Sequence, residues 1–206
     1  MSIAISDRSR MAMRILGSAT LASMWLAFSY AHLRAWQARD DWSYLLFALS
    51  ETLVAMLFVM RAQPVAVSGH VLDWIIAIAS TAAPLLFVPA DDAALPSARL
   101  LIVLAITVQI GGLLSLNRSF GLVAARRKIK TGGLYRVVRH PLYASYLLMY
   151  TGYVLSNTSA QNIAICLLAA ALLMLRAWRE ERFLSQDSEY VLYMRRVKYR
   201  VLPMVF

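Results

Sequence analysis

Apolar segments long enough to cross a bilayer constrain this chain more than any other feature of its sequence. A helix needs about 17–25 apolar residues to span the hydrocarbon core. Four segments come near that length, namely residues 14–36, 42–60, 72–88 and 100–116. Hydrophobic residues make up 60% of the 206 residues and charged residues 16%, whereas soluble domains are about 45–50% apolar and about 25% charged. The sequence therefore predicts an all-α, multi-pass integral membrane protein.

Two shorter apolar runs follow in the second half of the chain. They cover residues 141–155 and 163–178, and only the polar residues 156–162 separate them. At a rise of about 1.5 Å per residue the first run is barely long enough to cross a bilayer. We expect the two runs to form a tight helical hairpin whose second helix continues past Trp178. With the four longer segments this gives about six membrane helices.

The net charge of +10 lies entirely in the last 90 residues. Residues 1–116 hold seven Lys/Arg and seven Asp/Glu, whereas residues 117–206 hold fourteen and four. Lys and Arg accumulate in cytoplasmic loops. Three segments are basic, namely the N-terminus with Arg8, Arg10 and Arg14, the loop 117–140, and the C-terminal tail. Six crossings place all three on one side of the membrane and the acidic turn at Asp91 and Asp92 on the other. We therefore expect both termini to be cytoplasmic.

The loop 117–140 is long for a connection between helices, and such loops are usually functional or disordered. It ends in Lys130-Thr131-Gly132-Gly133-Leu134-Tyr135-Arg136-Val137-Val138-Arg139-His140, and Pro141-Leu142-Tyr143 open the hairpin. Two glycines leave backbone amides accessible, and a helix N-terminus beside Arg139 and His140 favours an anion. The alternative is an interfacial loop whose arginines meet lipid phosphates.

Two further polar clusters follow the hairpin. Arg176 and Glu180 are four residues apart, so they share one helix face, and Glu181 comes next. Adjacent acids would suit the hydroxyls or ammonium of a polar ligand, although a surface ion pair is an alternative. The tail interleaves tyrosines with cations in Tyr190, Tyr193, Arg195, Arg196, Lys198, Tyr199 and Arg200. That pattern also fits a tail lying on the membrane surface, and nucleic acid is not an expected partner.

In this order, beside a short hairpin, these elements resemble the isoprenylcysteine carboxyl methyltransferase family and the related membrane phospholipid methyltransferases. The resemblance covers about residues 117–203 and is carried by Arg118-Ser119-Phe120-Gly121, Thr131-Gly132-Gly133-Leu134-Tyr135, Arg139-His140-Pro141-Leu142-Tyr143, Glu180-Glu181, Tyr190, Tyr193 and Arg200-Val201-Leu202-Pro203. It implies a single membrane methyltransferase domain over residues 1–206. In that domain residues 1–116 form a helical membrane scaffold, and residues 117–206 form the cofactor loop, the hairpin and the tail.

The resemblance also implies a cofactor and a set of site residues. S-adenosyl-L-methionine is expected to donate a methyl group and leave as S-adenosyl-L-homocysteine, in a site open to the cytoplasm. The implied cofactor-binding residues are Lys130, Gly132, Gly133, Leu134, Tyr135, Arg139, His140, Pro141, Tyr143 and Glu180, and the implied catalytic residues are Arg176, Arg200 and Glu181. Arg176 and Arg200 would face the acceptor. No metal is expected, because no His/Cys/Asp cluster has the spacing of metal ligands.

Three functions stay open at this point. The first is carboxyl O-methylation of a prenylcysteine-like or other lipophilic acid, which Arg176 and Arg200 favour. The second is N-methylation of a phospholipid head group, with Glu180 or Glu181 as the base. The third, from another class, is a non-catalytic membrane lipid-binding protein. Glu51, in the middle of the second apolar segment, is a separate site hypothesis because acids at membrane depth are usually functional, and a hydrogen-bonded structural role is the alternative.

Overall fold

The computed structural model describes residues 7–39, 42–90 and 92–204, with side chains from Ile15 onward except that of Arg39. The charges of Arg8, Arg10, Arg14 and Asp91, which entered the predicted orientation, lie outside the described side chains. The chain divides into two compact units, Met1–Arg61 and Ala62–Phe206.

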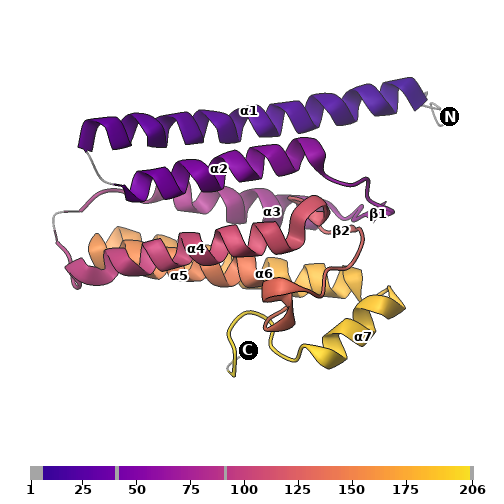
Figure 1. Ribbon diagram of the computed structural model, residues 1–206. Helices are drawn as coiled ribbons and strands as arrows, with labels where there is room; N and C mark the ends of the chain where they lie inside the picture. The colour runs from indigo at the N-terminus through magenta and orange to yellow at the C-terminus, as the bar shows by residue number, and fades with distance from the viewer. Residues whose placement is uncertain (1–6, 40–41, 91, 205–206) are drawn as a thin grey trace. The chain divides into compact units, whose positions relative to one another are not determined.

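The first unit is a pair of helices. Helix α1 (Asp7–Arg39) and helix α2 (Ser43–Met60) pack along one another (Figure 1). The Ser29 hydroxyl donates to the Ala48 carbonyl oxygen at 2.9 Å, and the rings of Trp25 and Phe58 lie 5.3 Å apart. A serine bonded across two apolar helices satisfies its own polar group at low cost in a lipid environment.

The second unit carries the remaining elements. In chain order these are β1 (Ala66–Val67), α3 (Val71–Ala82), η1 (Ala83–Leu86), η2 (Pro96–Ala98), α4 (Arg99–Leu116), η3 (Asn117–Ser119), β2 (Ala125–Arg126), η4 (Gly133–Arg136), α5 (Pro141–Ser156), α6 (Ala160–Leu184) and α7 (Ser188–Arg196). The strands β1 and β2 form one short antiparallel pair. That pair ties the segment before α3 to the loop before α5.

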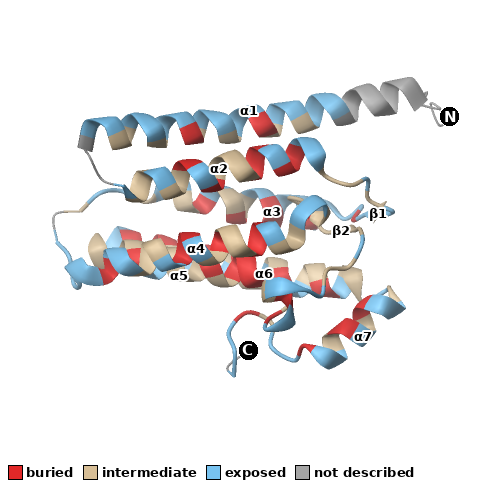
Figure 2. Ribbon diagram, viewed as in Figure 1, coloured by how far each residue is buried: buried red, intermediate tan, exposed pale blue. Residues whose placement is uncertain are grey.

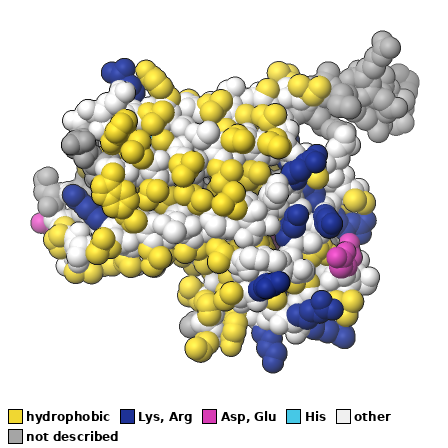
Figure 3. All heavy atoms as spheres, viewed as in Figure 1, with side chains coloured by type: hydrophobic (Ala, Val, Ile, Leu, Met, Phe, Trp, Pro, Cys, Tyr) yellow, Lys and Arg dark blue, Asp and Glu magenta, His cyan; other side chains and the backbone are white. Residues whose placement is uncertain are grey.

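Three helices in the described part of the chain are long and apolar enough to cross a membrane, namely Ser43–Met60, Pro96–Ser119 and Ala160–Leu184. Large apolar side chains on α4 and α6 point outward, among them Leu100, Leu114 and Leu167. Figure 2 colours exposed residues pale blue, among them parts of α4, and Figure 3 shows apolar side chains over the helices and Lys/Arg side chains around α7. An all-helical membrane protein is therefore confirmed, while the six crossings and the cytoplasmic termini stay predictions.

The third expected span, residues 72–88, is shorter as an α-helix than the sequence indicated. Helix α3 ends at Ala82, and the 3₁₀ turn η1 carries Pro84 at its start. Proline has no backbone N–H and its ring clashes with the preceding helical turn. The apolar run thus continues through Leu86 as one α-helix followed by a tighter turn.

The predicted hairpin is confirmed, with a tighter connection than expected. Helices α5 and α6 are joined by residues 157–159 alone, because α6 already begins at Ala160. The Ser159 hydroxyl accepts from the Asn162 amide at 3.1 Å and caps α6. Asn162 is fully buried, and its side-chain amide donates to the carbonyl oxygens of Val88 and Asn157, both at 2.8 Å. The polar residues 156–162 are therefore only partly a turn, because Asn162 is buried and hydrogen-bonded inside the protein.

Close packing of α4 against α5 depends on two glycines. A Cβ at Gly112 would lie 2.8 Å from a Leu142 methyl group, and one at Gly152 would lie 2.9 Å from the Ile102 side chain. Small residues let membrane helices approach closely and gain van der Waals contact. This contact fixes the start of α5 against the end of α4, where the polar residues of the second unit gather.

Candidate functional site

Glu181, near the end of α6, is the centre of a buried ionic cluster. One carboxylate oxygen accepts from Arg139 Nε at 2.6 Å and lies 3.0 Å from His140 Nε2, and the other accepts from Arg200 Nε at 2.8 Å. The Glu181 side chain is only 7% exposed. We name Arg139, His140, Glu181 and Arg200 the tail clamp, because they join the start of α5, the end of α6 and the C-terminal tail.

Backbone hydrogen bonds hold the tail to the same place. The amides of Arg139 and His140 donate to the carbonyl oxygens of Tyr199 and Arg200 at 3.0 and 2.8 Å. The Arg139 guanidinium also donates to the carbonyl oxygens of Val197 and Lys198, at 2.9 and 2.7 Å. A single arginine therefore bonds both the α6 carboxylate and the tail backbone.

Buried tyrosines of α7 attach the tail to the loop before α5. Tyr190, Tyr193 and Val197 form one buried cluster, and the Tyr193 hydroxyl donates to the Tyr135 carbonyl oxygen at 2.8 Å. Burial raises the pKa of the Tyr135, Tyr190 and Tyr193 phenols above the usual value. The three rings therefore stay neutral, as a packed cluster requires.

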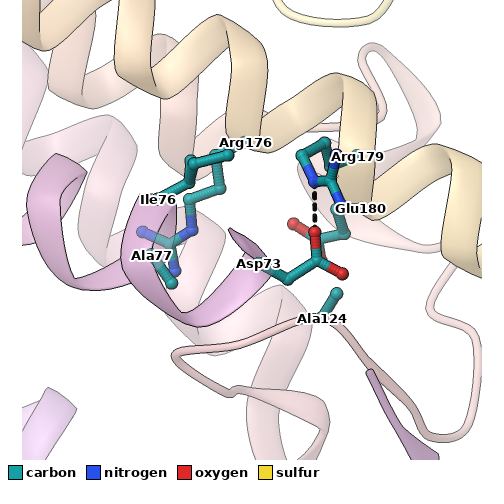
Figure 4. Close-up of a pocket in the computed structure, with 7 residues that line it drawn as sticks. All are labelled: Asp73, Ile76, Ala77, Ala124, Arg176, Arg179 and Glu180. Carbon is teal, nitrogen blue, oxygen red and sulfur yellow. Dashed lines mark hydrogen bonds and ion pairs between the residues drawn. The ribbon is translucent and has the colours of Figure 1, made fainter. Parts of the chain in front are cut away.

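A polar pocket opens between α3 and α6 (Figure 4). It encloses about 230 Å³, its open mouth included, and its lining residues are Asp73, Ile76, Ala77, Ala124, Arg176, Arg179 and Glu180. Two cations and two carboxylates thus meet in one small space. We call this set the polar pocket.

Arg176 is held in the pocket by neutral oxygens and an aromatic ring. Its guanidinium donates to the hydroxyls of Ser80 and Thr81, at 3.3 and 3.4 Å, and to the Leu122 carbonyl oxygen. It also lies 5.4 Å from the centre of the Tyr143 ring, within the range of a cation–π contact. These contacts orient the positive charge without neutralising it.

Glu180 faces a different neighbour from Glu181. Its carboxylate accepts from the Tyr143 hydroxyl at 2.5 Å, and the Tyr143 ring stacks on His140 with centroids 5.0 Å apart. Consecutive helical residues point about 100° apart around the helix axis. The two neighbouring acids therefore serve two sites: Glu180 the polar pocket and Glu181 the tail clamp.

Arg179 and Asp73, which both line the pocket, form an ion pair (Figure 4). Asp73, in the first turn of α3, also accepts from the Ser68 hydroxyl. The Asp73 residue is 8% exposed. The start of α3 is thereby joined to the end of α6.

The glycine loop is held by a serine of α4. Gly133 has φ +58, and the amide of Leu134 donates to the Ser115 hydroxyl at 3.4 Å. A Cβ at Gly133 would lie 2.2 Å from that same hydroxyl oxygen. A positive φ is costly for residues with a Cβ, so this turn needs glycine for both conformation and space.

The structure brings the predicted site residues together in two groups. Arg176, Tyr143 and Glu180 meet at the polar pocket, whereas Arg139, His140, Arg200 and Glu181 form the tail clamp. The loop residues Lys130, Gly132, Gly133 and Leu134 are exposed or half-buried before the buried Tyr135, and Pro141 is buried at the start of α5. Their roles toward a cofactor or an acceptor stay predictions.

Asp73 and Arg179 were not predicted from the sequence. A signal was available, because Asp73 opens the third apolar segment and Arg179 closes the last one. With six crossings both residues fall on the cytoplasmic side. Opposite charges at matching ends of two membrane helices indicate an ion pair.

The fold is that of a helical membrane protein, and both groups of charged residues lie at the ends of its apolar helices. Residues 94–187 match the family model described as phospholipid methyltransferase. This match confirms the predicted resemblance, and it includes Arg176, Glu180 and Glu181 but neither Asp73 nor Arg200. Together with the apolar helices it indicates a membrane methyltransferase. No curated protein matches the chain significantly.

The side chains of the polar pocket suit the chemistry of S-adenosyl-L-methionine, but the pocket is small for a ligand of that size. Glu180 is a half-buried carboxylate suited to an ammonium or to ribose hydroxyls, and the buried Tyr143 beside the pocket donates its hydroxyl to that carboxylate. The enclosed space of about 230 Å³ is below the roughly 300–1,000 Å³ of ordinary ligand pockets. The first-turn amides of Tyr143 and Ala144 already donate to the His140 carbonyl oxygen. Glu180 and Tyr143 are therefore the stronger anchors.

Proposed function

We propose that the protein is a membrane methyltransferase that uses S-adenosyl-L-methionine to methylate a carboxylate on a lipophilic acceptor. One observation carries the proposal: Arg176 and Glu180 line the same pocket, and Arg176 is bonded to neutral oxygens. A carboxylate acceptor is ionised near pH 7. Arg176 then has the charge to align it, while Glu180 belongs to the cofactor side.

In this proposal the cofactor is held by Glu180 and Tyr143, by the loop Lys130, Gly132, Gly133, Leu134 and Tyr135, and by Pro141 at the start of α5. The cofactor supplies an electrophilic methyl group when bound. Arg176 orients the acceptor oxygen, and the apolar residues around the pocket exclude water. Direct transfer depends on alignment of the reacting atoms more than on acid or base assistance.

We assign the tail clamp a positioning role rather than a contact with the reacting atoms. Glu181 already has Arg139, His140 and Arg200 within ion-pair distance. A carboxylate beside three nitrogen donors is a weak base, because its proton affinity is lowered by each positive neighbour. Arg139, His140 and Arg200 therefore support the loop and the tail, and Arg176 remains the cation for the acceptor.

A second candidate is N-methylation of a phospholipid head group, which the description of the matching family favours. An amine acceptor has to lose a proton, and Glu180 is the carboxylate that lines the pocket. Base lability separates the two products: mild base releases methanol from a methyl ester, whereas an N-methyl group stays in the lipid.

The test uses the full chain in nanodiscs of phosphatidylcholine with S-adenosyl-L-methionine labelled in its methyl group. N-acetyl-S-farnesylcysteine and phosphatidylethanolamine are offered as separate acceptors. We expect base-labile label in the first, and an Arg176→Gln variant should lose about 100-fold in rate while its cofactor affinity is unchanged. Stable label in phosphatidylethanolamine alone would overturn the carboxylate proposal.

Calorimetry with S-adenosyl-L-methionine separates both enzyme proposals from a non-catalytic lipid-binding protein. We expect the wild type and a Glu189→Gln control to bind, since Glu189 is exposed on α7. Absence of binding by the wild type would contradict both enzyme proposals.

A further inference from the structure

Asp73 is the one pocket carboxylate that the proposed chemistry does not use. It comes from α3, which lies outside the matched segment 94–187. It is buried and pairs with Arg179, which also lines the polar pocket. We propose that Asp73 is a specificity-determining residue, which sets the acceptor side of the pocket to a single positive charge and so selects head groups with one negative charge.

The charge count of the pocket supports this role. Arg176 and Arg179 bring two positive charges to the pocket, and Asp73 and Glu180 bring two negative ones. On the acceptor side, without Glu180, the ion pair of Asp73 with Arg179 leaves one positive charge. Glu180 belongs to the cofactor side, so the inference rests on the proposed function. The remaining single charge matches an anion such as a carboxylate or a phosphodiester.

The geometry also decides which arginine is left for the acceptor. Arg179 gives its Nε to Asp73, whereas Arg176 is bonded to hydroxyl and carbonyl oxygens. Two free guanidinium groups in one pocket would favour a phosphate monoester, which arginine forks bind tightly. Asp73 prevents this by occupying one of the two.

The Asp73 carboxylate is itself held in place. Ser68 donates its hydroxyl to Asp73 and accepts from the His70 amide at 3.3 Å. The Trp74 indole N–H donates to the Ser68 carbonyl oxygen at 3.1 Å. A carboxylate fixed from both sides has a defined position toward Arg179, as a charge-selecting group needs.

The test measures binding of three lipophilic anions to the full chain in phosphatidylcholine nanodiscs with S-adenosyl-L-homocysteine present. Dodecanoate and methyl dodecyl phosphate carry one negative charge, and dodecyl phosphate carries up to two near pH 7.5. The variants are Asp73→Asn, Arg179→Gln and the double variant, and Glu189→Gln serves as an acid-to-amide control on α7.

We expect the wild type and the control to bind both monoanions more tightly than dodecyl phosphate. Asp73→Asn should shift the affinity ratio at least about tenfold toward dodecyl phosphate, because it adds one net positive charge close to the ligand. The double variant restores the single positive charge, so its affinity ratio should return to the wild-type value. Arg179→Gln alone should weaken the binding of all three anions.

An unchanged ratio in Asp73→Asn would overturn the inference, as would a double variant that keeps the Asp73→Asn ratio. A wild type that prefers dodecyl phosphate, or binds none of the three, would overturn it as well. Methyl transfer to N-acetyl-S-farnesylcysteine is measured on the same protein preparations, with methyl-labelled S-adenosyl-L-methionine in place of S-adenosyl-L-homocysteine. Its absence contradicts the proposed function, whereas an unchanged ratio in an active enzyme contradicts only the role of Asp73.

Discussion

The tail clamp and the polar pocket contain the same kinds of side chain but balance their charges differently. In the clamp one buried carboxylate, Glu181, accepts from or lies beside Arg139, His140 and Arg200. In the pocket, Arg176 is bonded to neutral oxygens and an aromatic ring. A carboxylate with its partners in place stabilises the fold, whereas a cation held by neutral groups keeps an attraction for an anionic ligand.

The largest expected effect comes from breaking the clamp. Glu181→Gln removes the negative charge from a side chain that is 7% exposed and leaves Arg139 and Arg200 without their counter-charge. Removing one partner of a buried ion pair costs about 3–5 kcal/mol. We expect a strongly lowered unfolding temperature in detergent, measured by intrinsic fluorescence.

The neighbouring Glu180→Gln variant is the matched control for Glu181, because it makes the same change one residue earlier. Its own unfolding temperature should stay close to the wild type, since a glutamine oxygen still accepts from the Tyr143 hydroxyl. If both variants lose equal stability, the distinction between clamp and pocket is wrong.

The second prediction concerns the pocket and cofactor affinity. Glu180→Gln should lower the affinity for S-adenosyl-L-methionine by about 10–100-fold, because a hydrogen bond to a charged group contributes about 1.5–3 kcal/mol. Calorimetry on the folded variant measures this. Unchanged affinity would remove Glu180 from the cofactor site and leave the pocket without its main anchor.

The sequence predicted the helical membrane class and the hairpin, because both depend on local composition. The apolar runs 141–155 and 163–178 become α5 and α6 with small changes of boundary. The predicted helix boundaries were less accurate at two places, and in each a single proline or asparagine was responsible. Pro84 ends α3 early, and Asn162 belongs to the buried interior rather than to the turn.

The division of the candidate site into two groups was not predictable from the sequence. The spacing of Arg176, Glu180 and Glu181 shows which residues share a helix face, but not which neighbour each face meets. The partners of Glu181 come from the segment before α5 and from the tail, 19 to 42 positions away. Asp73 and Arg179 are 106 positions apart, so only the packing of α3 on α6 reveals their pairing.

A third, smaller effect is expected where the glycine loop rests on α4. Gly133→Ala places a Cβ 2.2 Å from the Ser115 hydroxyl oxygen at a residue with φ +58. We expect a loss of about 1–3 kcal/mol in unfolding free energy, together with weaker cofactor binding. Gly132→Ala is the control, because its Cβ would meet nothing within 4 Å. Equal losses in the two variants would show that the loop does not depend on this contact.

The smallest effect is expected from a tyrosine of α7, and it tests whether the Tyr193 hydroxyl holds the tail in addition to the clamp. Tyr193→Phe removes the hydroxyl that donates to the Tyr135 carbonyl oxygen at 2.8 Å and leaves the ring in its cluster. A hydrogen bond of this kind contributes about 0.5–1.5 kcal/mol, so the unfolding temperature should fall slightly and hydrogen exchange in the tail should rise. Tyr199→Phe, at an exposed ring, should change neither. A Tyr193→Phe protein with unchanged exchange would mean that this hydroxyl does not hold the tail, and that the buried rings, the backbone hydrogen bonds to Tyr199 and Arg200 and the clamp are sufficient.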